Sequence, residues 1–246
     1  MILAILQARM SSTRLPGKVM APILGRPMLL RQIERVERAW NFDKLLVATS
    51  SSPSDDVVAG VCGDEGIECF RGSLHDVLDR FVQAARRYEP EHLVRLTADC
   101  PLADPEVIDR IVEHHLDGGF DYTSNTREHT YPHGLDVEAC RYACLERAWR
   151  EATTPFEREH VMPYLWDSGH FRVGQLRQEK DHSRYRWTVD FPEDLELVRE
   201  IYGALYPTDP AFTTHDIIRL LCARPELATL NAARRDNDPT RDLHWR

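Results

Sequence analysis

The sequence predicts an α/β fold in which helices cover both faces of a mostly parallel, mixed central sheet. Residues 2–6 form an uninterrupted apolar run of strand length, which is typical of a strand buried on both faces of such a sheet. Later apolar runs alternate with helical patterns as far as residue 120, and this alternation predicts strand–helix–strand units. A basic, hydroxyl-rich loop at residues 7–18 follows the first strand, at the edge where such sheets bind ligands.

Helices and strands can be placed one after another in the first half of the chain. Pro27 suits the first position of a helix, which is predicted to run to about residue 39. Ser54 is predicted to cap the next helix, because Asp55 and Asp56 give it an acidic first turn. Strands are predicted at residues 45–48, 67–70 and 93–97, and a helix at residues 76–88.

The order is less regular after residue 121. Thr154 and Glu157 have the spacing of a capping box and predict a helix start. Thr214 is predicted to cap the last helix, which runs to about residue 222. Strands are predicted at residues 122–123, 135–137, 171–176 and 187–189, and a further helix at residues 192–205.

The composition excludes several classes of partner. The chain of 246 residues has a formal net charge of -9 and a pI near 5.7, whereas nucleic acids and anionic membranes attract clustered positive charge. Neither partner is therefore expected. The sequence shows no signal-peptide pattern and no apolar run long enough to span a bilayer, so we expect a cytoplasmic protein. No linker or repeat divides residues 1–246, which predicts one domain.

The basic loop is suited to phosphate binding. Arg9, Arg14 and Lys18 can donate charge-assisted hydrogen bonds to a nucleoside triphosphate, and the backbone N–H groups of residues 11–13 add further donors. Ser12 and Val19 stand where a Walker A loop requires glycine and a hydroxyl residue, so that loop is excluded. A solvated basic loop without a ligand is the alternative.

Six sequence blocks extend this interpretation across nearly the whole chain. They are Gln7-Ala8-Arg9 with Ser12-Thr13-Arg14-Leu15-Pro16-Gly17-Lys18, Phe70-Arg71-Gly72-Ser73 with Asp76-Val77-Leu78-Asp79-Arg80, Arg95-Leu96-Thr97-Ala98-Asp99-Cys100-Pro101-Leu102, Gly134-Leu135-Asp136-Val137-Glu138, Arg158-Glu159-His160-Val161 with Pro163-Tyr164, and Arg186-Trp187-Thr188-Val189-Asp190 with Pro192-Glu193-Asp194-Leu195. On these blocks the chain resembles the sugar-nucleotide cytidylyltransferases, which include the CMP-Kdo and CMP-sialic acid synthetases. Within them it is most similar to the spore coat polysaccharide biosynthesis protein F group.

This resemblance implies a three-layer α/β/α, Rossmann-like nucleotide-diphospho-sugar transferase fold. Residues 1–120 would form the nucleotide-binding half and residues 121–246 the half for sugar binding and dimerisation, in a homodimer. The implied reaction couples CTP to a sugar, expected to be a keto-sugar acid, and gives a CMP-sugar and pyrophosphate for surface polysaccharide or glycan synthesis. No residue stands out as a general base.

The resemblance also implies that Asp99 and Asp190 hold a catalytic Mg²⁺. Each acid follows a predicted strand, where a carboxylate can bind a metal without lying in the core. The alternative is that each only caps the element that follows it. Asp104, Glu193 and Asp194 are interpreted as acids of helix starts and not as metal ligands.

The remaining expected site residues fall into three sets. The catalytic set is Arg9, Lys18 and Asp99; the nucleotide set is Leu6, Ala8, Arg9, Ser12, Arg14, Lys18, Ser73, Asp79 and Arg80; the sugar set is His133, Asp136, Glu138, Arg158 and His160. Asp136 and Glu138 are expected to alternate onto one face of a strand. For the pair at 79–80 a helix-surface ion pair, for His133 a solvated loop, and for Arg158 and His160 a subunit contact remain as alternatives.

Two other functions remain open from the sequence. A glycosyltransferase that uses a nucleotide sugar shares the sheet and the metal, but its usual Asp-x-Asp pair is absent, because Asp99 is followed by Cys100 and Pro101. A non-catalytic CTP-binding subunit of a polysaccharide pathway is the second alternative, since a fold does not guarantee activity.

Overall fold

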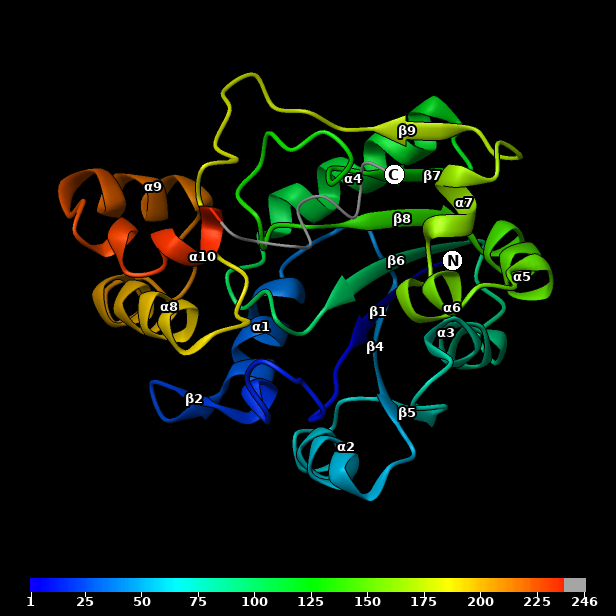
Figure 1. Cartoon of the computed structure of the whole chain (residues 1–246), viewed down its shortest axis with the longest axis horizontal. Helices are drawn as coiled ribbons and strands as arrows, with labels where there is room; N and C mark the ends of the chain where they lie inside the picture. Colours follow the sequence, from blue (N-terminus) through cyan, green and yellow to red (C-terminus); the bar gives the residue numbers. More distant parts are fainter. Residues whose placement is uncertain (237–246) are drawn as a thin grey trace.

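The computed structural model, which describes residues 1–236, is built on a seven-stranded sheet (Figure 1). Its strand order is β5-β4-β1-β6-β8-β7-β9. The bounds are β1 Ile2–Gln7, β4 Lys44–Ser50, β5 Cys69–Gly72, β6 His92–Thr97, β7 Tyr122–Ser124, β8 Glu138–Arg141 and β9 Val173–Gln175. β1 pairs in parallel with β4 and β6, whereas β8 runs antiparallel to both of its neighbours. The predicted mostly parallel, mixed sheet is therefore confirmed.

Helices cover both faces of the sheet, and the first strand shows why. Along β1, Ala4 and Leu6 pack into one apolar cluster, whereas Leu3 and Ile5 pack into another on the opposite face. The first cluster contains residues of α1 Met28–Val36, α2 Asp56–Asp64, α4 Pro105–Gly118, α8 Pro192–Leu205 and α9 Thr214–Ala223. The second contains residues of α3 Val77–Arg86, α5 Tyr142–Glu151 and α7 Pro163–Asp167. The continuous apolar run at the start of the sequence therefore packs into two cores, one on each face of the sheet.

Short elements complete the described chain. They are η1 Lys18–Met20, β2 Pro22–Ile23, β3 Arg26–Pro27, η2 Pro53–Asp55, α6 Pro155–His160, η3 Leu227–Thr229 and α10 Ala232–Asp236. β2 and β3 form a separate two-stranded hairpin. Within residues 1–236, no helix combines the length and apolar character needed to cross a membrane.

The helix-start predictions are partly confirmed. The capping box of Thr154 and Glu157 opens α6, and α8 has the predicted bounds. The predicted cap Ser54 is wrong, because Asp55 precedes α2 and its buried carboxylate accepts hydrogen bonds from Ser50 and from the Met10 N–H. The predicted cap Thr214 is also wrong: Thr213 caps α9.

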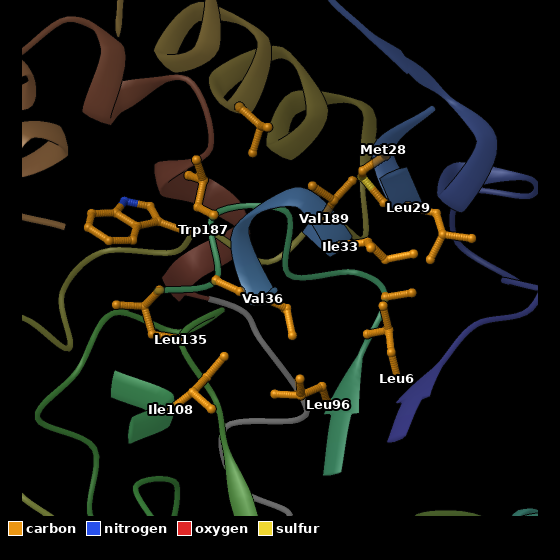
Figure 2. Packing of buried hydrophobic residues seen from close by; sticks show 14 of the residues in the cluster. Leu6, Met28, Leu29, Ile33, Val36, Leu96, Ile108, Leu135, Trp187 and Val189 are labelled. Carbon is orange, nitrogen blue, oxygen red and sulfur yellow. The ribbon is translucent and has the colours of Figure 1, made fainter. Parts of the chain in front are cut away.

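Two predicted strands, at residues 135–137 and 187–189, do not form. The apolar side chains of these segments lie in the core instead, with Leu135, Trp187 and Val189 labelled in Figure 2. The chain just before them forms one isolated bridge, between His133 and Arg186, and the Trp187 and Thr188 N–H groups donate to the His133 carbonyl. Gly134 has a φ of 109°, and a Cβ there would lie 2.4 Å from the Thr188 nitrogen, so only glycine allows this close backbone approach. Core burial, not sheet pairing, accounts for both apolar patterns.

A buried histidine pair lies at the end of the sheet opposite to the basic loop, where β6 begins. His92 Nδ1 lies 3.0 Å from His115 Nε2, and His115 Nδ1 lies 3.0 Å from Thr123 Oγ1. Burial, together with the nearby His92, lowers the pKa of His115 to about 4, and burial also lowers the pKa of His92. The folded protein therefore holds His115 neutral in a range where an unfolded chain would protonate it.

We predict that acid weakens the fold through His115. Between pH 6.5 and about 4, the unfolded state binds a proton that the folded state does not, so the free energy of unfolding falls as pH falls, by about 1.4 kcal/mol per pH unit. Urea unfolding at several pH values should show a flatter pH dependence for His115→Gln than for wild type. The exposed His75→Gln is the control and should follow wild type. Parallel curves for wild type and His115→Gln would refute the assignment.

Candidate active site

The site lies at the point where the strand order of the sheet reverses. From β1 the chain adds β4 and then β5 on one side, and then crosses to add β6 on the other. In such sheets the crevice beyond the carboxyl ends of the two strands at this switch point binds ligands. Here β1 ends at Gln7 and β6 ends at Thr97, and both residues line one open cavity.

Two adjoining cavities open at this edge. The first, which we call the loop cavity, is lined by Gln7, Arg9, Ser11, Ser12, Thr13, Arg14, Lys18, Val19, Arg95, Thr97, Ala98, Asp99, Glu159, His160 and Asp190. The second, the inner cavity, is lined by Arg14, Arg95, Thr97, Asp99, Cys100, Thr126, His133, Asp136, Glu138, Phe156, His160, Met162, Pro163, Trp166, Thr188 and Asp190. Six residues border both, so the cavities meet around Asp99 and Asp190.

The basic loop is shaped by its own backbone. The Met10 carbonyl accepts hydrogen bonds from the Ser12 and Gly17 N–H groups, each at 2.9 Å. Ser12 Oγ accepts a further bond from the Leu15 N–H at 3.3 Å. Gly17 has a φ of 74°, which a glycine adopts without strain, and it delivers Lys18 to the start of η1. The loop is thus folded so that its lysine turns back toward the sheet.

Lys18 joins the two acids that were predicted to hold a metal. Its Nζ donates to Asp99 Oδ2 at 3.0 Å, to Asp190 Oδ1 at 2.9 Å and to the Val189 carbonyl at 2.7 Å. The Lys18 side chain is only 9% exposed, so its charge depends on these partners. The structure therefore brings together the loop, the end of β6 and residue 190, as the family resemblance implied for the two acids.

Backbone contacts explain how Asp190 reaches Asp99. The Val189 N–H donates to the Asp99 carbonyl at 2.7 Å, and Thr188 Oγ1 donates to the same oxygen at 3.3 Å. This contact joins segments about 90 residues apart in the chain and places the two carboxylates around one ammonium group. The capping alternative is not supported for either acid: Asp104 caps α4, and Phe191 precedes α8.

Three cations, Lys18, Arg14 and Arg186, contact the Asp190 carboxylate. Arg14 Nη2 lies 2.7 Å from Asp190 Oδ1, and Arg186 Nη2 donates to Asp190 Oδ2 at 2.8 Å. Arg186 is buried and also pairs with Asp194, which lies in the first turn of α8 as predicted. Together with Lys18, these arginines make the site favourable for a polyanion.

The ionisation of the central pair follows from these contacts. Desolvation opposes the charge on Asp99, but the Lys18 ammonium and the hydrogen bond from Thr97 outweigh it and lower the pKa of Asp99 below its usual range. Desolvation likewise acts to lower the pKa of Lys18, yet Asp99 and Asp190 raise it above its usual value. Both groups are therefore charged at neutral pH.

The donor set fits Mg²⁺ in part. Magnesium is usually held by one or two carboxylates together with substrate phosphates, and one oxygen of Asp99 and one of Asp190 already contact the same cation. Within residues 1–236, no group of three His, Cys, Asp or Glu side chains forms a complete protein cage. A divalent ion would thus use these two acids and needs further oxygens from a ligand.

The predicted nucleotide residues are placed differently from one another. Arg9, Ser12, Arg14 and Lys18 line the loop cavity, whereas the Leu6 side chain is buried in the core and Ala8 is nearly so. Both can therefore offer a ligand only their backbone.

The second predicted nucleotide segment is tied down by its own contacts. Arg80 is fully buried and donates to the Ser73 carbonyl at 2.6 Å, and its Nε and Nη2 have no partner among the described residues. Burial, with the nearby Arg9 charge, lowers the pKa of Arg80 to about 10. Asp79 accepts from Trp149 Nε1 at 2.9 Å and from Gln83 Nε2 at 3.1 Å. The alternative interpretation, a surface ion pair between residues 79 and 80, is therefore not supported.

Four of the five predicted sugar residues line the inner cavity. They are His133, Asp136, Glu138 and His160. The expected single strand face is wrong, because β8 begins at Glu138 and Asp136 lies in the preceding loop. Arg158 lies outside both linings and pairs with Asp76, which caps α3.

Several cavity residues were missed by the sequence analysis. Arg95 and Thr97 come from β6, and Phe156 and Trp166 add an aromatic wall from α6 and α7. Arg186 lines neither cavity, and its ion pairs with Asp190 and Asp194 were missed as well. The aromatic wall gave no usable signal, since aromatic residues at such spacing are usually core.

Comparison with known proteins identifies the family. A family model described as cytidylyltransferase matches residues 3–213, which is most of the chain. The chain belongs to the cytidylyltransferase family. It is accordingly a CTP-dependent nucleotidyltransferase, and the glycosyltransferase alternative is set aside.

Relatives of this cytidylyltransferase support the same assignment. The spore coat polysaccharide biosynthesis protein SpsF of Bacillus subtilis is 34% identical over 242 residues, covering 93% of this chain and 97% of SpsF. A solved cytidylyltransferase from Leptospira borgpetersenii is 31% identical, with a TM-score of 0.87, covering 92% of this chain and 96% of its own. The predicted family resemblance is confirmed.

A more distant structure shows the fold alone. The CMP-2-keto-3-deoxy-manno-octonic acid synthetase, solved in complex with CTP, has a TM-score of 0.64 at 19% identity and covers 82% of this chain and 98% of its own. The predicted nucleotide-diphospho-sugar transferase fold is thereby confirmed for this cytidylyltransferase.

Proposed function

We propose that this cytidylyltransferase couples CTP to the hydroxyl of a keto-sugar acid, giving a CMP-sugar and pyrophosphate for surface polysaccharide or glycan synthesis. The observation that carries the proposal is the contact of Lys18 with Asp99 and Asp190 at the point where the loop and inner cavities meet. One cavity can then hold a triphosphate and the other an acceptor, with the reacting atoms between them.

The basic loop supplies the phosphate contacts. Arg9, Arg14 and Lys18 line one cavity and can donate to the oxygens of the triphosphate, where charge accumulates as pyrophosphate leaves. Asp99 and Asp190 would hold Mg²⁺, which when bound offsets the charge of the phosphates. The acceptor hydroxyl would attack the α-phosphorus in line from the inner cavity, forming the new P–O bond as the bond to pyrophosphate breaks and giving up its proton to water.

The base would lie against the segment from Ser73 to Arg80. Arg80 fixes the Ser73 carbonyl from a fully buried position, and its Nε and Nη2 have no partner among the described residues, so this side chain can hold the backbone of the segment in place for contact with the base. Asp79 is held by Trp149 and supports this segment. The backbone of Leu6 and Ala8 would complete the contact.

The acceptor would occupy the inner cavity. His133, Asp136 and His160 offer polar groups to sugar hydroxyls, and Phe156 and Trp166 add the aromatic wall of the same cavity. Arg158 would act indirectly, because it ties α6 to the Asp76 cap of α3.

The proposal assigns residues 1–120 to nucleotide binding and residues 121–246 to acceptor binding and dimerisation within one domain. It also includes a cytoplasmic homodimer. Sedimentation of the purified protein measures the oligomeric state.

Pyrophosphate release tests the proposal directly. Purified protein with Mg²⁺ is given CTP, UTP, ATP or GTP together with a panel of keto-sugar acids and neutral sugars. We expect release that requires both CTP and a keto-sugar acid. Silence across the panel while CTP still binds would favour a non-catalytic CTP-binding subunit, and release with another nucleotide would refute the choice of base.

A further inference from the structure

Arg95 lies where the two cavities meet. It projects from β6 two residues before Thr97, so both side chains lie on the same face of the sheet and border both cavities. The Arg95 side chain is 15% exposed, so part of it remains open to the two cavities that it lines. No role in the reaction described above uses this arginine.

The neighbouring strands hold Arg95 in place. Arg95 stands directly opposite Glu138 in the β6–β8 ladder, and its Nη1 donates to Glu138 Oε2. The other oxygen of Glu138 accepts from the buried Tyr122 hydroxyl at 2.5 Å. Both carboxylate oxygens of Glu138 are therefore occupied, and this residue is suited to positioning Arg95 and less to binding sugar hydroxyls.

Arg95 keeps donors that Glu138 does not use. Its Nε has no hydrogen-bond partner among residues 1–236. The other arginine that borders both cavities, Arg14, is already paired with Asp190 and belongs to the phosphate loop. Arg95 is thus the strand-borne cation available at the junction.

The chemistry of a keto-sugar acid calls for a cation at this place. Its attacking hydroxyl and its carboxylate are attached to the same carbon, so the carboxylate must lie within a few bonds of the reacting oxygen. The reacting oxygen must itself lie at the junction, because the nucleotide and the acceptor enter from different cavities. A planar guanidinium matches the two oxygens of a carboxylate.

We propose that Arg95 binds the carboxylate of the acceptor and selects acidic sugars, with Glu138 and Tyr122 as its positioning residues. This inference rests on the proposed coupling of CTP to a sugar. An acceptor without a carboxylate would leave the partly buried guanidinium without a hydrogen-bond acceptor. The free-energy cost of that unpaired group would make such an acceptor a poorer substrate than an acidic sugar.

The test compares matched acceptors in the pyrophosphate-release assay with CTP and Mg²⁺. The acids are N-acetylneuraminate and 3-deoxy-manno-octulosonate, and their methyl esters are the same sugars without the negative charge. Wild type should prefer an acid over its ester by about 100-fold in kcat/KM. Arg95→Met should abolish the preference and raise the KM for the acid by a similar factor, with the KM for CTP within about twofold of wild type.

Three further variants separate positioning from folding. Glu138→Gln should raise the KM for the acid by a smaller factor and leave the KM for CTP unchanged, because it loosens Arg95 without removing it. Arg141→Met makes the same substitution on β8 at an exposed ion pair with Asp121 and should behave as wild type. If Arg95→Met does not fold, acid and ester are compared with Arg95→Lys instead, because this variant keeps a positive charge that can pair with Glu138.

The outcomes separate this inference from the proposed function. An equal rise in the KM for CTP and for the acid would place Arg95 on the phosphates and overturn the inference. So would equal use of acid and ester by wild type, or turnover of neutral sugars alone, although the coupling of CTP to a sugar would then stand. If wild type releases no pyrophosphate with any acceptor, the proposed function itself fails and this inference fails with it.

Discussion

An Asp99→Asn variant should lose turnover by at least about 10³-fold, because the carboxylate that pairs with Lys18 and would hold the divalent ion is replaced by a neutral amide. Its fold should survive. The Asp99 side chain is 29% exposed, Lys18 keeps its bonds to Asp190 and the Val189 carbonyl, and the backbone contact from the Val189 N–H to residue 99 does not involve the carboxylate. We expect the free energy of unfolding to fall by less than about 2 kcal/mol.

The measurement pairs pyrophosphate release with urea unfolding, and the chain offers a matched control. Asp104 is a buried acid five residues further on that caps α4 and accepts a hydrogen bond from the Thr214 N–H at 2.9 Å. Asp104→Asn should lose about 1 kcal/mol of stability and keep its kcat, because both oxygens of Asp104 accept hydrogen bonds and an amide can replace only one of them. A collapse of the fold in Asp99→Asn, or turnover close to wild type, would show that Asp99 is structural.

Much of the site could be predicted because one physical rule places it. Parallel sheets bind ligands beyond the carboxyl ends of their strands, so a basic loop after residues 2–6 and an acid after residues 93–97 were expected at one edge. The structure confirms that Lys18 meets Asp99 there. Bringing Asp190 to the same point needed the family resemblance, since the contact of Val189 with Asp99 leaves no local signal in the sequence.

The wrong predictions from the sequence, two strands and the role of Glu138, have a common physical origin: each depends on tertiary packing. The apolar runs at residues 135–137 and 187–189 satisfy a strand pattern, but periodicity does not distinguish a sheet from an irregular segment buried in the core. The pairing of Arg95 with Glu138 depends on the register of the antiparallel strand β8, which is set by tertiary packing. Glu138 was therefore assigned to the sugar, although its two oxygens are occupied by Arg95 and Tyr122.

A Lys18→Met variant should weaken triphosphate binding and strengthen metal binding at the same time. Lys18 lines the loop cavity, so its loss should reduce CTP affinity by about 100-fold and CMP affinity much less, because CMP lacks the β- and γ-phosphates. The same ammonium lies between Asp99 Oδ2 and Asp190 Oδ1, where a divalent cation would bind. In the nucleotide-free protein the Lys18 ammonium and a divalent cation would therefore compete for the same two carboxylate oxygens.

Mn²⁺ binding followed by electron paramagnetic resonance, without nucleotide, measures this competition independently of turnover. We expect Lys18→Met to bind Mn²⁺ at least about tenfold more tightly than wild type, since a unit charge about 4 Å away contributes several kcal/mol at an effective dielectric constant near 20. Lys44→Met removes a lysine on β4 that pairs with Glu68. This variant should change neither the affinity for CTP nor the affinity for Mn²⁺. Equal losses for CTP and CMP would place Lys18 away from the β- and γ-phosphates. Unchanged Mn²⁺ binding would mean that the metal does not use the oxygens that Lys18 holds.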